Sequence, residues 1–258
     1  MVRMSKDQMG RSIELEDSPS KIISLVPSIT ELLYYFGLKN QICGVTKFCI
    51  YPAEKSENVQ QIGGTKNFRE DLIREICPDL ILANKEENHK EGIEALEKTF
   101  PVWISDVNNV IQAIDMIRSI GYLVQKEIKA LKLIEQIEQN WSAVHKLYSG
   151  SVLYLIWNDP IMAVGNNTYV DHVLSHLGFR NTMSSYERYP EVTADLLSSL
   201  NPDYVFLSSE PFPFKERHIK VYQKLFPHSK FLLVDGEMFS WYGSRMLYAP
   251  EYFKTIKV

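Results

Sequence analysis

The chain has 258 residues, of which 45% are hydrophobic and 23% are charged, and its formal net charge is −4. This balance is ordinary for a globular protein of one or two domains, and the lack of a basic stripe argues against a nucleic-acid partner. No apolar run approaches the ~20 residues that span a bilayer, so no membrane insertion is expected.

The N-terminal stretch MVRMSKDQMGRSIELEDSPSK carries basic residues but no apolar segment followed by a cleavage site. We do not expect it to act as a secretory signal as it stands, although a signal could have been removed. The three cysteines, Cys43, Cys49 and Cys77, fall in the first third without paired spacing. Reduced thiols are therefore expected, not a disulfide framework.

From Lys21 onward, strand-like and helix-like segments alternate. The first half gives strands at 21–26, 41–46, 79–83 and 102–106, with helices at 27–37, 71–76 and 89–98. The second half gives strands at 151–157, 203–208 and 230–236, with helices at 168–178, at 195–200 and from about Ser244. Such alternation is typical of parallel β-α units and predicts an α/β fold.

Two motifs of the first half return in the second half. DLIREICPDL (71–80) is matched by DLLSSLNPDY (195–204), with equal spacing from Asp71 to Pro78 and from Asp195 to Pro202. FGLKN (36–40) is likewise matched by LGFRN (177–181), and each contains a Gly suited to a helix C-cap. Two matches in the same order predict two structurally related lobes.

A segment between the halves, from about Tyr122 to Tyr148, has no Pro or Gly and repeats apolar residues at three- and four-residue steps. It predicts one stiff helix of roughly 40 Å. The predicted architecture is two Rossmann-like lobes, residues 21–107 and 149–258, joined by residues 108–148. Because open α/β sheets bind ligands beyond the carboxyl ends of their strands, we expect the ligand in a cleft between the lobes.

Several longer stretches carry a family resemblance: SLVPSITELLYYFG, GVTKFCIYP, IGGTKN, PDLILANKEEN, YLIWNDPIMAVG, RYPEV, PDYVFLSSEPFPF and LVDGEMFSWYGSR. In order and spacing, the chain resembles the substrate-binding proteins of ABC importers for cobalamin, haem and iron–siderophores, and is closest to the cobalamin-binding branch. The resemblance implies a monomer in the periplasm or cell envelope that captures a metal chelate and delivers it to an ABC transporter permease.

The choice among corrinoid, haem and ferric siderophore stays open at this level. An intracellular corrinoid-handling protein that is not coupled to transport is the alternative that the signal-free N-terminus motivates, and it leaves a cytoplasmic location open. No intrinsic cofactor is expected, because a metal held in an organic cage needs no protein ligands. The chain has no GxSxG, HExxH, Walker or dinucleotide-binding motif, so an enzyme is not expected.

Aromatic and polar residues follow several of the predicted strands and should line the cleft. FCIYP supplies Phe48, Cys49 and Tyr51, LIWNDP supplies Trp157 and Asn158, ERYP supplies Arg188 and Tyr189, and FSWYGSR supplies Phe239, Ser240, Trp241, Tyr242 and Arg245. Rings with a few polar groups suit a large planar macrocycle. The candidate ligand-binding residues are Tyr51, Trp157, Arg188, Tyr189, Phe239, Trp241, Tyr242 and Arg245.

Some of these residues have a second interpretation. Trp157 could belong to the core, and Arg245 could cap the sheet or join an ion pair, whereas loop context favours exposure of Tyr189, Trp241 and Tyr242. No protein metal site is predicted. Glu86, Glu87 and His89 are interpreted as a solvated helix start, and Cys49 as a small buried hydrophobe.

Asp71 and Asp195 stand in the first turn of equivalent helices, where a carboxylate complements the helix dipole. The resemblance implies a further role for them, because proteins of this family present an acidic residue from each lobe to arginines of the permease. The family more often has Glu at these positions, and Glu70 is a nearby substitute. Asp71 and Asp195 are therefore the candidate permease-docking residues.

Overall fold

The computed structural model describes residues 2–53 and 59–258. The chain divides into two compact units: unit 1 comprises Met1–Val107, Ile111–Gln136 and Tyr242–Arg245, and unit 2 comprises Asn108–Val110, Ile137–Trp241 and Met246–Val258. Both are built from mixed α/β elements with parallel strands, as the alternating sequence pattern predicts. Within the described residues no helix is long and apolar enough to cross a membrane.

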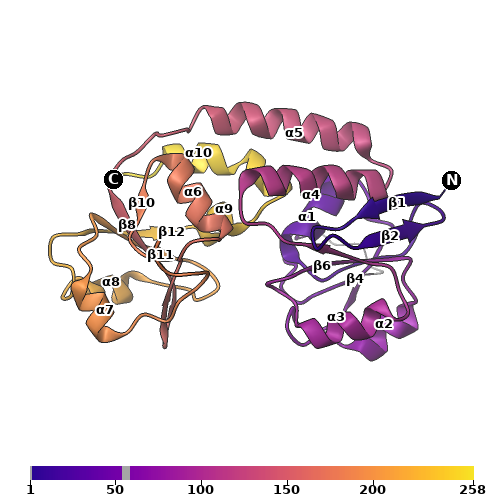
Figure 1. The fold of residues 1–258 in the computed structure, drawn as a ribbon, viewed down its shortest axis with the longest axis horizontal. Helices are drawn as coiled ribbons and strands as arrows, with labels where there is room; N and C mark the ends of the chain where they lie inside the picture. The colour runs from indigo at the N-terminus through magenta and orange to yellow at the C-terminus, as the bar shows by residue number, and fades with distance from the viewer. Residues whose placement is uncertain (1, 54–58) are drawn as a thin grey trace. The chain divides into compact units, whose positions relative to one another are not determined.

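Unit 1 is a five-stranded parallel sheet between two layers of helices (Figure 1). Its strands, in the order β5-β4-β3-β6-β7, are β3 (Ile22–Ser24), β4 (Ile42–Val45), β5 (Gln60–Gln61), β6 (Leu80–Asn84) and β7 (Val102–Ser105). The helices are α1 (Pro27–Tyr35), α2 (Glu70–Ile76), α3 (Lys90–Glu97) and α4 (Val110–Leu123). Helices α2 and α3 cover one face, where Ile81 and Val102 pack with Ile73, Ile93 and Leu96. Because both faces are covered, β6 is buried at all five positions.

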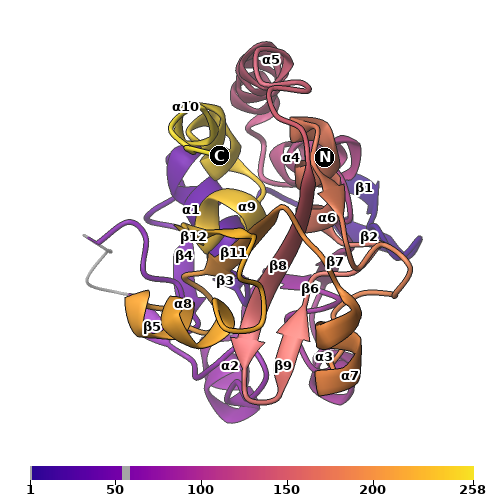
Figure 2. The same ribbon diagram turned by 90° about the vertical axis from the view of Figure 1, so that its left-hand side faces the viewer.

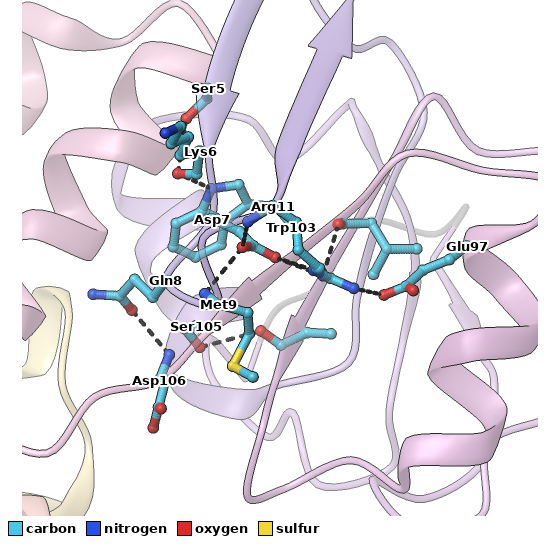
Figure 3. A network of polar contacts seen from close by, with 12 residues as sticks. Ser5, Lys6, Asp7, Gln8, Met9, Arg11, Glu97, Trp103, Ser105 and Asp106 are labelled. Carbon is cyan, nitrogen blue, oxygen red and sulfur yellow. Dashed lines mark hydrogen bonds and ion pairs between the residues drawn. The ribbon is translucent and has the colours of Figure 1, made fainter.

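A hairpin that precedes this sheet is absent from the predicted elements. Strands β1 (Arg3–Lys6) and β2 (Ser12–Leu15) pair antiparallel, and their turn packs on β7, where the Gln8 amide donates to the Ile104 carbonyl at 3.0 Å. Figure 3 shows the Asp7 carboxylate at the centre of the turn. It is fully buried and accepts hydrogen bonds from the Met9 and Arg11 amides and from the Arg11 guanidinium, which also bonds Glu97. The hairpin therefore belongs to unit 1.

Unit 2 is a mixed sheet of order β10-β8-β11-β12, with β9 antiparallel to the end of β8 (Figure 2). Its strands are β8 (Ser151–Asn158), β9 (Ile161–Ala163), β10 (Arg180–Asn181), β11 (Tyr204–Ser208) and β12 (Lys230–Val234). Helix α5 (Glu127–Ser142) is divided between the two units. The other helical elements of unit 2 are α6 (Tyr169–Leu177), α7 (Ala194–Ser199), α8 (Glu216–Tyr222), α9 (Gly236–Ser240), the 3₁₀ turn η1 (Ser244–Leu247) and α10 (Ala249–Lys254). Ser244 and Arg245 of η1 belong to unit 1.

The two faces of the unit 2 sheet differ in composition because side chains alternate along each strand. Aliphatic residues Leu153, Leu155, Val205 and Leu207 point to the face covered by α7 and α8. The opposite face is aromatic, and its rings are those of Tyr154, Phe179, Tyr204, Phe206, Phe239, Tyr252 and Phe253. Helices α6, α9 and α10 lie over this second face (Figure 1).

The sequence repeat corresponds to equivalent elements of the two sheets. In each unit the helix that follows the first strand ends before a left-handed Gly, Gly37 at φ +79° and Gly178 at φ +96°. The chain then enters a strand next to the first strand of the sheet, β4 beside β3 in unit 1 and β10 beside β8 in unit 2. The strand on the other side of the first strand, β6 or β11, is preceded by a Pro-Asp pair. The predicted relation between the two halves is therefore present in the topology.

The Pro-Asp pair has a structural role in both units. The Asp79 carboxylate accepts hydrogen bonds from the Ser20 amide and hydroxyl at 2.7 Å each and from the Lys21 amide at 2.9 Å, directly before β3. The Asp203 carboxylate accepts from the amide and hydroxyl of Ser151, the first residue of β8, at 2.6 and 2.7 Å. Asp79 thereby satisfies the backbone donors that lead into β3, and Asp203 satisfies the first donor of β8. This shared bonding explains the repeated frame.

The predicted connecting helix is present, but its predicted extent from Tyr122 to Tyr148 is wrong. Helix α4 ends at Leu123, Gln125 takes a left-handed φ of +56°, and α5 (Glu127–Ser142) begins afresh. A non-glycine residue at positive φ cannot continue a right-handed helix, and apolar spacing alone does not reveal the break. The remaining helix, α5, has 16 residues, and the boundary between the units falls inside it, after Gln136.

Candidate functional site

In unit 1, the loop after β4 presents large apolar side chains at the carboxyl end of the sheet. Phe48 and Ile50 are 50% and 51% exposed, and Tyr51 is 36% exposed. The ammonium group of Lys47 lies 5.0 Å from the centre of the Phe48 ring. Three exposed apolar side chains within four residues form an apolar surface at the strand ends, where α/β sheets bind ligands.

Arg245 lies beneath this loop and is held on both sides. Its guanidinium carbon is 4.3 Å from the centre of the Tyr51 ring. Nε and Nη2 lie 3.1 and 3.0 Å from the two carboxylate oxygens of Glu31 in α1. The interpretation of Arg245 as a member of an ion pair is therefore confirmed. Its contact with a ligand stays a prediction, although Arg245 also contacts a candidate ligand-binding ring.

The backbone before Arg245 explains how the segment reaches α1. Gly243 has φ +102°, and a Cβ there would lie 3.4 Å from the Ser28 carbonyl and 3.5 Å from the Leu32 side chain. These are ordinary van der Waals distances, so the positive φ, not the approach to the helix, favours Gly here. In the same segment, the Tyr242 hydroxyl accepts a hydrogen bond from the Asn84 side-chain amide at the end of β6, at 2.8 Å.

In unit 2, Trp157 lies at the end of β8 and is 37% exposed, so the interpretation as a core residue is wrong. Its indole N–H donates to the Asp159 carbonyl at 3.0 Å, and its ring meets Phe212 edge to face at 5.7 Å. The neighbouring Asn158 accepts from the Tyr222 hydroxyl at 3.1 Å. An exposed indole with a fixed orientation suits stacking on a ligand.

Arg188 and Tyr189 occupy the half-buried loop between β10 and α7. Arg188 has φ +58°, and its Nη1 donates to Asn108 Oδ1 at 2.6 Å and to the Asn167 carbonyl at 2.9 Å. This arrangement ties the segment around Asn108 to the rest of unit 2. The guanidinium therefore has a structural task that its loop position did not indicate.

Two parts of the prediction for the FSWYGSR segment need correction. Phe239 is fully buried, with its ring 4.9 Å from that of Phe253, so it is a core residue and is not presented at the strand ends. Trp241 and Tyr242 are 9% and 6% exposed, so the expectation that loop context exposes them is wrong. Short helices α9 and η1 flank these residues and pack them inward.

The residues considered for metal binding have other tasks. Cys49 is fully buried between the hydroxyls of Thr30 and Thr46, at 3.1 and 3.2 Å, and burial raises the pKa of its thiol. The Glu86 and Glu87 amides both donate to the Asn84 side chain, which turns the chain toward α3. Among the described residues, no group of three or more His, Cys, Asp or Glu side chains is arranged to hold a metal ion.

The two candidate docking acids are exposed, each in the first turn of its helix. Asp71 forms an ion pair with Arg69, and a hydrogen bond from this guanidinium lowers the pKa of the carboxylate. Asp195 follows the N-cap Thr193, whose side chain accepts from the Leu196 amide. Glu70, the alternative to Asp71, lies 3.7 Å from Arg74. The two acids thus differ in their immediate charge environment.

Sequence reasoning missed three residues of these surfaces. Glu31 is a single acid inside an apolar helix, a pattern that by itself marks a partly buried charge with a partner. Ile50 stands between two residues that were named. Phe212 belongs to the EPFPF segment after β11, where the same strand-end argument applied.

Comparisons with known proteins agree with this architecture. Residues 22–226 match the model of the family described as periplasmic binding protein. A Bacillus subtilis (strain 168) protein named uncharacterized ABC transporter substrate-binding lipoprotein YvrC is 26% identical over 212 residues, which cover 77% of this chain and 67% of that protein. A vitamin B12-binding protein of Yersinia pestis (strain Pestoides F) is 25% identical over 195 residues, covering 73% and 69%.

Solved structures share the fold. The periplasmic vitamin B12 binding protein BtuF of Vibrio cholerae superposes with a TM-score of 0.78 at 18% identity, covering 92% of this chain and 97% of that one. The siderophore binding protein BauB, solved with acinetobactin and ferric iron, gives a TM-score of 0.80 at 16% identity over 98% of both chains. The family match spans most of the chain, and on that ground the chain belongs to the periplasmic binding protein family.

Proposed function

We propose that this protein is the solute-binding component of an ABC importer, and that it captures a metal chelate and delivers it to the permease. The family match and the substrate-binding relatives support the general role. The observation that carries the ligand class is that each unit by itself exposes aromatic rings at its strand ends, Phe48 and Tyr51 in unit 1 and Trp157 in unit 2. Exposed rings at strand ends bind flat, partly apolar ligands by stacking.

The chelate that we place first is a corrinoid, because vitamin B12-binding proteins are among the sequence relatives. The protein would hold the macrocycle through its organic periphery and supply no metal ligand. The residues that we propose as its contacts are Tyr51, Trp157, Arg188 and Tyr189. Trp241, Tyr242 and Arg245 are 9%, 6% and 8% exposed, so we do not propose them as direct contacts. The location that we propose is the cell envelope, which the description of the family as periplasmic and the naming of one relative as a lipoprotein support.

A ferric siderophore and haem are the competing ligands, and spectra distinguish them. The purified protein is incubated separately with cyanocobalamin, haemin and a ferric tris-catecholate, and each mixture is passed over a gel-filtration column. The proposal predicts that the visible bands of cyanocobalamin elute with the protein. Co-elution of haemin or the ferric chelate alone would replace the corrinoid by that ligand, and co-elution of none would contradict the function itself.

For delivery, we propose that Asp71 and Asp195 meet basic residues of the permease. Both are exposed and each lies at the start of the equivalent helix of its unit. The test is association with the permease in nanodiscs, for the wild type and for the variant D71A/D195A, with Glu70 also replaced in a third variant. Undiminished association of the triple variant would leave only the helix-dipole role. Recovery of the protein from the cytosol of its native cells, without permease contact, would instead favour an intracellular chelate-handling role.

A further inference from the structure

A buried side chain of unit 1, that of Asn88, joins three segments at the carboxyl ends of the sheet strands. It lies between β6 and α3 and is 4% exposed. Its Oδ1 accepts a hydrogen bond from the amide of Asn84, the last residue of β6, at 2.8 Å. Its Nδ2 donates to the carbonyls of Leu25, after β3, and Thr65, after β5, at 3.3 and 3.0 Å. The side-chain amide therefore fixes three strand-end segments against one another.

The Asn88 amide is held firmly in this orientation. Its two donated hydrogen bonds equal the number of its N–H groups, and its oxygen is bonded as well. Leu25 and Thr65 lie 63 and 23 residues from Asn88 in the sequence, so the bonds join distant parts of the chain. A shorter side chain would leave both carbonyls without this donor, and a buried polar group that loses its partner is costly.

The loop that contains Thr65, residues 63–67, contacts the segment that carries Phe48. We call it the Thr65 loop. The Lys47 amide donates to the Gly63 carbonyl of this loop at 2.7 Å. A Cβ built on Gly64 would lie 3.4 Å from Cε2 of Phe48, so the ring lies close to the loop backbone. Phe48 is nevertheless 50% exposed. The Thr65 loop therefore supports the backbone before Phe48 and one edge of its ring.

We propose that Asn88 is a positioning residue for ligand binding: it fixes the Thr65 loop, and the loop fixes the Phe48 ring on which a chelate stacks. This inference rests on the proposed function, because Phe48 is one of the exposed rings assigned there to the ligand. Asn88 itself is buried and does not touch the ligand. In the competing, purely structural role, the side chain would only satisfy the carbonyls around it.

A double-mutant cycle distinguishes these two roles. Dissociation constants are measured by spectral titration for the wild type, N88A, F48A and N88A/F48A. The titrant is the chelate, among cyanocobalamin, haemin and the ferric tris-catecholate, that co-elutes with the wild type. N88A should raise Kd about tenfold, an effect within the range for residues of one contact network.

The second background decides whether Asn88 acts through Phe48. If it does, N88A should change Kd by less than about twofold once F48A is present, because the ring that it positions is gone. An unchanged Kd in N88A, or an effect of N88A that is equally large with and without F48A, would overturn the inference.

The chain offers a matched control in unit 2. Asn181 is 6% exposed, its Nδ2 donates to the Val164 carbonyl at 3.0 Å and to Asp171 at 2.8 Å, and its Oδ1 accepts from the Met183 amide at 3.0 Å. All of these partners belong to unit 2. N181A should lower Tm as N88A does but leave Kd unchanged. An equal loss of affinity in N181A and N88A would mean general destabilisation, and would overturn the inference.

A measurement without ligand tests the positioning step by itself. Hydrogen exchange followed by NMR reports on the Lys47 amide, which is bonded to Gly63. In N88A this amide should exchange about tenfold faster than in the wild type, because the loop that protects it has lost its anchor. In N181A its exchange should be unchanged.

The variant N88D serves if N88A does not fold. Its side chain keeps an acceptor for the Asn84 amide but, when ionised, has no donor for the Thr65 carbonyl, so it should also speed the exchange of Lys47. A wild type that binds none of the three chelates would contradict the proposed function. Exchange of the Lys47 amide that is unchanged in N88A and N88D would overturn the inference about Asn88, whether or not a chelate binds.

Discussion

Replacing Phe239 should separate folding stability from ligand binding. Its ring is fully buried on the aromatic face of the unit 2 sheet. The centre of the Phe239 ring lies 5.3 Å from the ring centre of Tyr154, 6.1 Å from that of Phe206, 6.3 Å from that of Tyr252 and 4.9 Å from that of Phe253. Truncation to Ala removes these contacts and leaves a cavity that surrounding rings cannot fill without moving.

The expected cost is about 3–5 kcal/mol of the free energy of unfolding, the range for Phe→Ala in a packed core. For a protein of this size, that corresponds to a lowering of Tm by about 10 °C. Circular dichroism during urea and thermal unfolding measures both quantities. Spectral titration with the chelate, at a temperature where the variant is folded, measures affinity, which should stay within about threefold of the wild type.

The opposite pattern would refute this reasoning. A variant F239A with unchanged unfolding but an affinity lowered more than tenfold would mean that the ring is presented to the ligand. The milder variant F239L, which retains a large apolar side chain, should lose a smaller part of the stability and none of the affinity. It serves as the control if F239A does not fold.

Three further outcomes follow from the described contacts. Y51A should weaken chelate binding by about 1–3 kcal/mol with little change in Tm, since a partly exposed ring contributes little to the core. Isothermal titration calorimetry measures the loss of affinity, and an unchanged affinity would exclude the ring from the site. D71A/D195A should weaken permease association most at low salt, where exposed charges are least screened, and salt-independent weakening would point to a different contact. Hydrogen bonds from the Ser151 amide and hydroxyl lower the pKa of Asp203. The Asp203 carboxylate therefore stabilises the folded protein fully above the ordinary carboxylate pKa, and this stabilisation is lost as pH falls through the lowered pKa. D203N should flatten the acid side of the curve of Tm against pH, and an unaltered curve would contradict that linkage.

Much of the architecture could be predicted from local patterns. Alternating strands and helices, the Gly after each first helix and the matched Pro-Asp frames all depend on short-range chemistry, and the two sheets contain them. The N-terminal hairpin could not be predicted this way, because it is held by contacts with residues far away in the sequence, Gln8 with Ile104 of β7 and Arg11 with Glu97. The spacing of apolar residues likewise gives no sign of the helix break at Gln125.

The candidate site could be predicted only in part. The strand-end argument led to segments in which Tyr51 and Trp157 are exposed, and their contact with a ligand stays a prediction. Local context could not distinguish Phe239 from these rings, because its burial depends on contacts with β8, β11 and α10 that lie far away in the sequence. Glu31 was missed for the same reason, since its partner Arg245 is 214 residues away.

The most direct test of the central claim is to locate the metal of the bound chelate in a crystal of the complex. The protein is crystallised with cyanocobalamin, and anomalous diffraction at the cobalt edge gives the metal position without assumptions about the ligand's shape. Our account predicts one cobalt peak, with the macrocycle in contact with Tyr51 and no protein side chain of unit 1 bonded to the metal. A cobalt peak far from the strand-end loops, or a cobalt bound directly by a unit 1 side chain, would contradict it.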